Sequence, residues 1–224
     1  MLIVGWDTGG ERGSVGLLGD DRPLSEIDFS AALKQGEKLL PALDMALRLA
    51  EAPRCDIGLI SVSIGPGSFT GLRIGIATAK GLARSLGIPM VGVPAVDSYA
   101  RAANFWDGPV WVLLSDRRDW IYAASYRKSK SLAPVQAIAL EAFCKIQEGS
   151  ERTLFVGPGA EQHRTKLTGK IEGSVVASAG LNRPSGLQIA SLGWEKYCRS
   201  GCDELYELEP VYLQAPLAEA MAQE

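Results

Sequence analysis

The sequence predicts an α/β protein with two lobes, of which the first holds a mixed five-stranded sheet and the second is reduced. The longest apolar, β-branched run, Ile57–Gly65, is bounded by turn residues and predicts a buried strand. A helical pattern follows it through Leu86. Other strands precede and follow this pair, and 224 residues are enough for two packed lobes. We therefore expect a first lobe at residues 1–104 and a smaller second lobe at residues 105–224.

Three short strands are predicted at the start of the chain, at Leu2–Trp6, Gly13–Leu18 and Leu24–Phe29. The first two are joined by the turn Asp7–Arg12, which is rich in residues that tolerate a positive φ. This turn resembles the first phosphate loop of the actin-like ATPase and sugar-kinase fold, in which the aspartate serves a metal-bound phosphate and backbone N–H groups cradle its oxygen atoms. Asp7 could instead cap its own turn, and the sequence leaves both alternatives open.

A helix ending near Ala50 is predicted next, with Pro41 in its first turn, where the missing N–H of proline does no harm. Its apolar arc is wider than contact with one sheet requires. The apolar positions are Leu39, Leu40, Leu43, Ala46, Leu47 and Ala50, flanked by Ala42, Met45 and Leu49.

Residues 71–86 predict a second helix with the same excess of apolar surface. Arg73, Lys80 and Arg84 fall on one narrow line, and small residues lie on the far side. Each glycine at 71, 75 and 81 costs about 1 kcal/mol against alanine, so we expect another backbone to approach this helix closely. That backbone could belong to the same chain or to a partner. The predicted partner contacts of both helices are Leu39, Leu43, Met45, Leu47, Gly71, Ile74, Gly75, Thr78 and Leu82.

The first lobe is completed by a strand at Ile88–Val93 and a helix at Pro94–Ala103. Three antiparallel strands followed by helix, strand, helix, strand and helix is the order of the ribonuclease-H-like and actin-like ATPase folds. We therefore predict that fold for the first lobe.

The second lobe is predicted to open with two strands separated by a charged turn. Further along, the patterns indicate two helices, one strand and a terminal strand or tail. These elements are Trp111–Ser115, Trp120–Tyr126, helix Glu141–Gln147, strand Thr153–Val156, helix Arg183–Arg199 and the terminal segment Glu209–Pro216.

A basic cluster surrounds the predicted hairpin of the second lobe. A solvated hairpin surface is favoured over a contact with RNA or phosphate. The cluster comprises Arg117, Arg118, Arg127, Lys128 and Lys130.

Composition limits the function classes. The formal net charge of −3 and the sequence pI of about 5.4 disfavour a high-affinity grip on RNA by this chain alone. No apolar run reaches the roughly 18 residues of a membrane span, and Met1–Asp7 has no basic n-region. The four cysteines are scattered, which is typical of reduced thiols, so we expect a cytoplasmic protein.

Histidine is represented once, by His163, in a polar stretch that predicts a surface position. Metal sites with paired histidines are thereby excluded, and a Ser-His-Asp triad or Cys-His dyad would have to use this residue. We therefore predict no catalytic residue and no metal site.

The turn Gly65–Ser68 is neither a Walker loop nor a Rossmann fingerprint, because its glycine spacing is wrong and no Gly-Lys-Ser/Thr follows. Ser68 is expected to be the N-cap of the following helix. A structural turn and an anion contact at the helix N-terminus both remain open. The candidate nucleotide or anion contacts are Asp7, Thr8, Gly9, Gly65, Gly67 and Ser68.

The segment Ser63–Ala83 resembles the signature of the TsaB (YeaZ) family. The chain departs from the family pattern at Gln35-Gly36, at Ser115 and at Gln214, which puts ligand contacts from those positions in doubt. Further similar segments are Asp7-Thr8 with Ser14–Leu18, Glu37–Pro41, Arg117-Arg118 with Ile121–Ala123, and Pro210–Leu213.

The resemblance implies a non-catalytic scaffold that pairs with a TsaD-type catalytic subunit through the two helices of the first lobe. With a TsaE-type ATPase, such a pair forms N6-threonylcarbamoyladenosine beside the anticodon of tRNA, which would be reached through the complex rather than directly. The resemblance also implies a homodimer when the chain is alone, no intrinsic cofactor, and ATP or ADP with Mg²⁺ at the partner interface. The metal-binding histidines of TsaD are replaced here by Pro94–Ser98.

Two alternatives from other classes remain. The first is an ATP-dependent phosphotransferase or ATPase of the actin-like fold that uses Asp7 and the turns at Gly9-Gly10 and Gly65–Gly67. The second is a homodimeric binding module that does not depend on TsaD.

Overall fold

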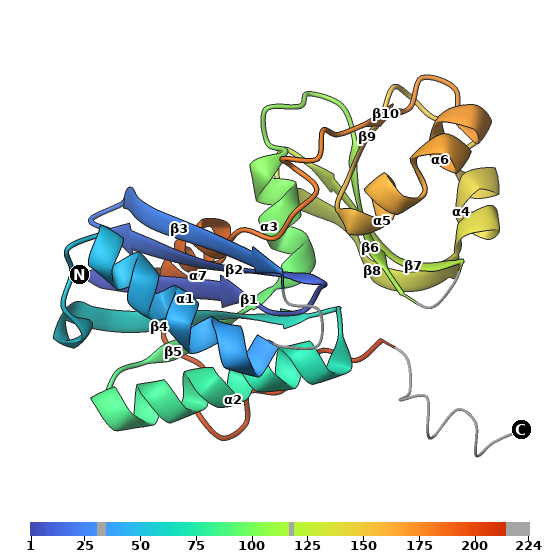
Figure 1. Ribbon diagram of the computed structural model, residues 1–224. Helices are drawn as coiled ribbons and strands as arrows, with labels where there is room; N and C mark the ends of the chain where they lie inside the picture. The colour runs from blue at the N-terminus through green and yellow to red at the C-terminus, as the bar shows by residue number, and fades with distance from the viewer. Residues whose placement is uncertain (31–34, 117–118, 214–224) are drawn as a thin grey trace, which may run out of the picture. The chain divides into compact units, whose positions relative to one another are not determined.

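The computed structural model describes residues 1–30, 35–116 and 119–213, and it confirms a two-lobed α/β architecture (Figure 1). The first compact unit comprises Met1–Ser98 and Pro184–Pro210, and the second comprises Tyr99–Arg183 with the residues from Val211 onward. These bounds differ from the predicted division at residues 104 and 105, because the last helix returns to the first unit.

The first unit is built on a five-stranded sheet in the order β3-β2-β1-β4-β5. β1 pairs with β2 and β2 with β3 in antiparallel fashion, whereas β1–β4 and β4–β5 are parallel. This topology confirms the predicted ribonuclease-H-like order. The strands are β1 (Leu2–Asp7), β2 (Arg12–Gly19), β3 (Arg22–Ser30), β4 (Ile57–Gly65) and β5 (Met90–Pro94).

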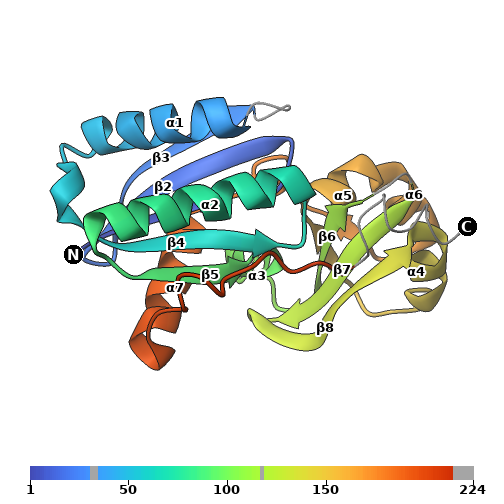
Figure 2. The ribbon, with the colours of Figure 1, turned by 90° about the horizontal axis from the view of Figure 1, so that it is seen from below.

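Helices cover both faces of this sheet. α1 (Gln35–Leu49) and α2 (Phe69–Leu86) lie on one face, and α7 (Gly186–Ser200) lies on the other (Figure 2). A short helical turn, η1 (Arg54–Asp56), precedes β4, and α3 (Ala95–Ala102) follows β5. The two units divide within α3.

α1 begins earlier than the sequence predicts, so Pro41 lies inside the helix and not in its first turn. A proline at this position cannot donate to the carbonyl of Glu37, one turn earlier. Pro41 and Glu37 are both exposed, so water can replace the missing hydrogen bond.

α7 lies unusually close to β1 and β2. Gly5 and Gly16 are directly opposite each other in the β1–β2 pair. A Cβ at Gly5 would overlap the backbone of Ala190, and a Cβ at Gly16 would overlap the backbone of Leu187. Only glycine therefore permits this helix to reach the sheet.

The start of α7 is held by the Glu26 carboxylate of β3. Its Oε1 atom accepts hydrogen bonds from the Leu187 N–H (3.1 Å) and the Ser185 hydroxyl (2.8 Å). A carboxylate at a helix N-terminus also interacts favourably with the helix dipole. This contact fixes α7 although more than 100 residues separate it from β3 in the sequence.

A strap, defined as Asp203–Leu208, follows α7 and covers the open edge of β5. The Asp203 carboxylate accepts a hydrogen bond from the Gly92 N–H (2.7 Å) and pairs with Lys196 (2.7 Å). Covering an edge strand in this way protects it from pairing with other chains. Residues 209–213 form no strand, and the rest of the predicted terminal segment lies outside the described residues.

The second unit contains another five-stranded sheet, in the order β10-β9-β6-β7-β8. β8, β10, α5 and α6 are not predicted by the sequence, because β8 exposes most of its residues and the others are short. The elements are β6 (Val110–Ser115), β7 (Trp120–Arg127), β8 (Lys130–Ala139), α4 (Leu140–Ile146), β9 (Leu154–Val156), α5 (Pro158–Gln162), α6 (Arg164–Lys170) and β10 (Val175–Val176).

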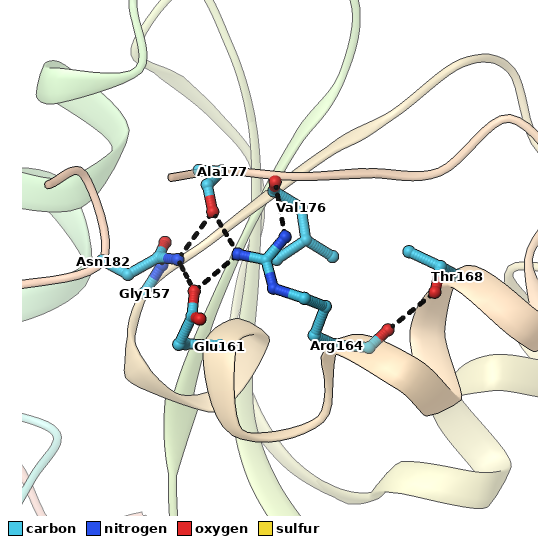
Figure 3. Close-up of polar contacts among 7 residues, drawn as sticks. All are labelled: Gly157, Glu161, Arg164, Thr168, Val176, Ala177 and Asn182. Atoms are coloured by element: carbon cyan, nitrogen blue, oxygen red, sulfur yellow. Dashed lines mark hydrogen bonds and ion pairs between the residues drawn. The ribbon is translucent and has the colours of Figure 1, made fainter. Parts of the chain in front are cut away.

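A polar cluster fastens α5 and α6 to the segment after β10 (Figure 3). Arg164 donates to the carbonyls of Val176 (3.2 Å) and Ala177 (2.7 Å) and pairs with Glu161 (2.6 Å). Asn182 donates to Glu161 (2.7 Å) and accepts from the Gly157 N–H (2.9 Å). These groups satisfy one another, which makes the cluster a structural feature of the second unit.

We predict that Gly16→Ala destabilises the protein by about 1 to 3 kcal/mol or more, because the neighbours of the new methyl group are backbone atoms that cannot move aside. Urea unfolding measures this change. Gly81→Ala is the matched control, since nothing lies within 4 Å of its Cβ position. That variant is expected to gain about 1 kcal/mol from helix propensity. Equal effects of the two substitutions would contradict the close packing of α7.

Candidate functional site

The turn after β1 and the turn after β4 pack directly on each other. The Ser68 N–H donates to the Gly9 carbonyl at 2.7 Å. A Cβ at Gly67 would lie 2.6 Å from the same carbonyl oxygen. The two candidate phosphate turns therefore form one closed contact.

Three of the N–H groups that an anion could use here are already bonded within the chain. The Gly9 N–H donates to the Asp7 carboxylate (2.7 Å), and the Gly71 N–H donates to the Ser68 hydroxyl (3.3 Å). The latter bond confirms Ser68 as the N-cap of α2. Because the Ser68 N–H is also occupied and Pro66 lacks one, these residues cannot present a full set of N–H groups to a nucleotide phosphate. The geometry favours the structural interpretation of both turns.

Asp7 is buried at the end of β1. Burial raises the pKa of its carboxyl above the usual 3.8, and the Gly9 N–H opposes this shift. The nearby Ser63 hydroxyl also lowers the pKa of Asp7, but it satisfies no hydrogen-bond geometry. Asp7 therefore caps its own turn, and burial disfavours its charged form.

His163 is buried, with 8% of its surface exposed, so the predicted surface position is wrong. The residue joins α5 to α6, where the two residues before it are exposed and the next, Arg164, is half-buried. Burial lowers its pKa below the usual 6.5. Across residues 1–30, 35–116 and 119–213, no three histidine, cysteine or acidic side chains are grouped to hold a metal.

The buried glycines of α2 face this chain's own backbone. A Cβ at Gly71 would overlap the Thr8 carbonyl, and a Cβ at Gly75 would overlap the Thr8 hydroxyl. Thr8 in turn donates to the Gly71 carbonyl at 2.7 Å. The prediction that Gly71 and Gly75 contact a partner is therefore wrong. The backbone that approaches α2 closely at these two positions belongs to the same chain.

Three predicted partner contacts of α1 also lie in the core. Leu39, Leu43 and Leu47 are buried against the sheet. A wide apolar arc on a helix does not show which of its residues face the sheet. The sequence prediction assigned to the partner the residues that in fact face the sheet. Of the predicted residues, Met45 is exposed, and Ile74, Thr78 and Leu82 are half-buried.

An exposed apolar surface remains on α1 and α2, which we call the pairing face. It presents Leu40 (47% exposed), Met45 (55%) and Leu49 (65%) from α1. α2 adds the exposed Ala77 and Gly81. Exposed apolar residues on two neighbouring helices are typical of a protein interaction surface. The half-buried members of the pairing face are Ile74, Thr78 and Leu82.

The basic hairpin of the second unit carries paired charges. Arg127 forms an ion pair with Glu151, and Lys128 pairs with Asp107 at 2.7 Å. This pairing fits a solvated surface better than an RNA contact. Arg117 and Arg118 lie outside the described residues, as does Gln214.

Two other positions that depart from the family pattern lie within the described residues. The Ser115 hydroxyl donates to Gln162 (2.7 Å), and Gln35 begins α1.

Among the described residues no helix is long and apolar enough to cross a membrane. The four cysteines are free, with Cys144 buried and the other three exposed.

Comparisons of the sequence and of the structure with known proteins all find relatives named TsaD, TsaB or YeaZ. A family model described as TsaD, tRNA N6-adenosine threonylcarbamoyltransferase, matches residues 30–193. The tRNA threonylcarbamoyladenosine biosynthesis protein TsaB of Bacillus subtilis is 27% identical, covering 98% of this chain and 97% of its own. TsaB of Escherichia coli is also 27% identical, with 97% and 96% covered. The structure of YeaZ from Pseudomonas aeruginosa superposes with a TM-score of 0.79 at 22% identity, covering 95% of this chain and 99% of its own.

We predict that Asp7→Asn makes the protein more stable than the wild type at pH 7. Because the pKa of Asp7 is raised on folding, the wild type loses stability as the pH rises above 3.8 through the folded-state pKa, whereas asparagine does not ionise. The advantage of the variant should therefore disappear below pH 3.8. Urea unfolding at several pH values measures it. A variant that is less stable at pH 7 would contradict the structural role given to this carboxyl.

Proposed function

Because the chain belongs to the TsaD family, described as tRNA N6-adenosine threonylcarbamoyltransferase, we propose that it is a non-catalytic subunit of the machinery that forms N6-threonylcarbamoyladenosine in tRNA. The resemblance to the TsaB branch is confirmed by relatives of that name over nearly the full chain. Their printed function, tRNA threonylcarbamoyladenosine biosynthesis, is the process in which we place this chain.

The non-catalytic role is supported by the hydrogen bonds within the turns after β1 and after β4. Asp7, Ser68 and the Gly71 N–H, which could serve a phosphate in an actin-like ATPase, hold the turns and α2 together instead. The single histidine is buried between α5 and α6 with a lowered pKa. These residues contribute to folding rather than to chemistry, which favours the scaffold over the phosphotransferase.

The subunit acts by pairing with a TsaD-type catalytic subunit through the pairing face. The observation that supports this most strongly is the exposure of Leu40, Met45 and Leu49 on α1. Together with the small side chains of Ala77 and Gly81, they offer a partner helix an apolar surface that it can approach closely.

The remaining parts of the proposal follow from this pairing. A TsaE-type ATPase joins the pair, nucleotide with Mg²⁺ binds at a joint interface, and tRNA is reached through the complex. In the absence of the catalytic subunit, two copies pair through the same face. The free, mostly exposed thiols suit the cytoplasm, where tRNA is modified.

We predict that Met45→Glu prevents co-elution with the TsaD-type subunit in size-exclusion chromatography, because a carboxylate would be buried without a partner in the interface. The residue is exposed in the isolated chain, so folding should be unaffected. Leu132→Glu is the matched control, since Leu132 is 58% exposed on β8 of the second unit. Retained co-elution of the Met45 variant would contradict the proposed function. Turnover of Mg-ATP by the isolated chain would contradict it as well and would favour the phosphotransferase.

A further inference from the structure

The two helices that carry the pairing face have a positive net charge, although the chain as a whole is negatively charged. α1 and α2 carry five lysine and arginine side chains and two acidic ones, whereas the formal net charge of the chain is −3. Of the two acids, Asp44 already forms an ion pair with Arg54. The cations are Lys38, Arg48, Arg73, Lys80 and Arg84, and the acids are Glu37 and Asp44.

Two of these cations have only neutral partners. Lys80 donates to the Tyr206 carbonyl (3.1 Å), and Arg84 donates to the Tyr206 hydroxyl (2.7 Å). Among the described residues neither cation pairs with a carboxylate, and α2 itself contains no acidic residue. Arg73 extends the same line over the ring of Phe69, 3.9 Å from its centroid. The charges of Lys80 and Arg84 are therefore not neutralised by α2 or by their contacts with Tyr206.

This charge distinguishes between two kinds of partner. In a two-fold dimer the same surface patch lies on both sides of the interface. Pairing two copies through α1 and α2 therefore brings a net positive surface against an identical one. A different partner can instead offer acidic residues, and like charges that face each other are an established way to reject a wrong partner.

We propose that the charge of α2, and of Lys80 and Arg84 in particular, selects an acidic face of the catalytic subunit over a second copy of this chain. The proposal rests on the proposed function, which supplies the pairing face. The apolar residues give affinity to both kinds of pair, and the cations set the preference between them.

An acidic protein surface suits this site better than RNA. The strap places the exposed carboxylates of Glu204 and Glu207 on either side of Tyr206, which itself contacts Lys80 and Arg84. A polyanion would meet these carboxylates along with the cations. A protein partner can match both signs with separate side chains.

The test measures both equilibria, homodimer and heterodimer, by sedimentation as salt rises from about 50 mM to about 500 mM, which screens exposed charges. We expect the homodimer Kd to fall by about tenfold and the heterodimer Kd to rise by about tenfold. If salt changes both constants in the same direction, or neither, the charge inference is overturned.

Variants separate the charge from the rest of the interface. Arg84→Glu should tighten the homodimer and weaken the heterodimer, whereas Arg199→Glu, an equal charge change on the exposed end of α7, should change neither. Tyr206→Phe removes the hydroxyl that Arg84 contacts but keeps the charge, so it should leave the salt response unchanged. Loss of that response in Tyr206→Phe would overturn the proposal.

The two variants Met45→Glu and Arg84→Glu show separately whether the pairing face is wrong and whether the charge inference is wrong. If Met45→Glu weakens neither complex, the pairing face and with it the proposed function are wrong. If it weakens both while Arg84→Glu acts equally on the two, only the charge inference is wrong. Binding of tRNA to the isolated chain that Arg84→Glu abolishes would assign these cations to RNA and would also overturn the inference.

Discussion

The contact between Thr8 and the glycines of α2 sets the orientation of that helix, and the pairing face depends on it. Thr8 donates to the Gly71 carbonyl at 2.7 Å, and the Trp6 indole donates to the Gly75 carbonyl at 3.1 Å. Side chains at Gly71 and Gly75 would prevent this approach. With this side of α2 fixed against β1, Ala77, Gly81 and the line of cations point outward. The packing of Gly71 and Gly75 against Thr8 therefore determines which residues of α2 face outward.

A second contact, between the turns after β1 and β4, supports the proposal that the chain works without nucleotide chemistry of its own. The turns after β1 and β4 are the two that the sequence suggests as phosphate contacts. In this chain they close on each other through the bond from the Ser68 N–H to the Gly9 carbonyl. Asp7 is buried with a raised pKa and serves its own turn. These residues of the fold are used for packing, which agrees with the proposed subunit that works by binding.

The sequence predicted the first lobe well because its signals are strong and local. β1 to β5, α1 and α2 follow from apolar runs, helical periodicity and turn residues. The prediction was wrong where a long-range contact decides the outcome. Nothing near Gly71 or Gly75 shows that Thr8 covers them, and nothing near Leu43 shows which half of a wide apolar arc faces the sheet. β8 was missed because an edge strand with mostly exposed residues lacks an apolar alternation.

The central claim is that the outward surface of α1 and α2 binds the catalytic subunit, and methionine oxidation by hydroxyl radicals tests it without any substitution. Met45 and Met1 are both about half exposed in the isolated chain, and Met45 alone belongs to the pairing face. The account predicts that adding the TsaD-type subunit slows the oxidation of Met45 by about tenfold or more while Met1 reacts as before. Equal oxidation of Met45 with and without the partner, under conditions where the complex is formed, would contradict it.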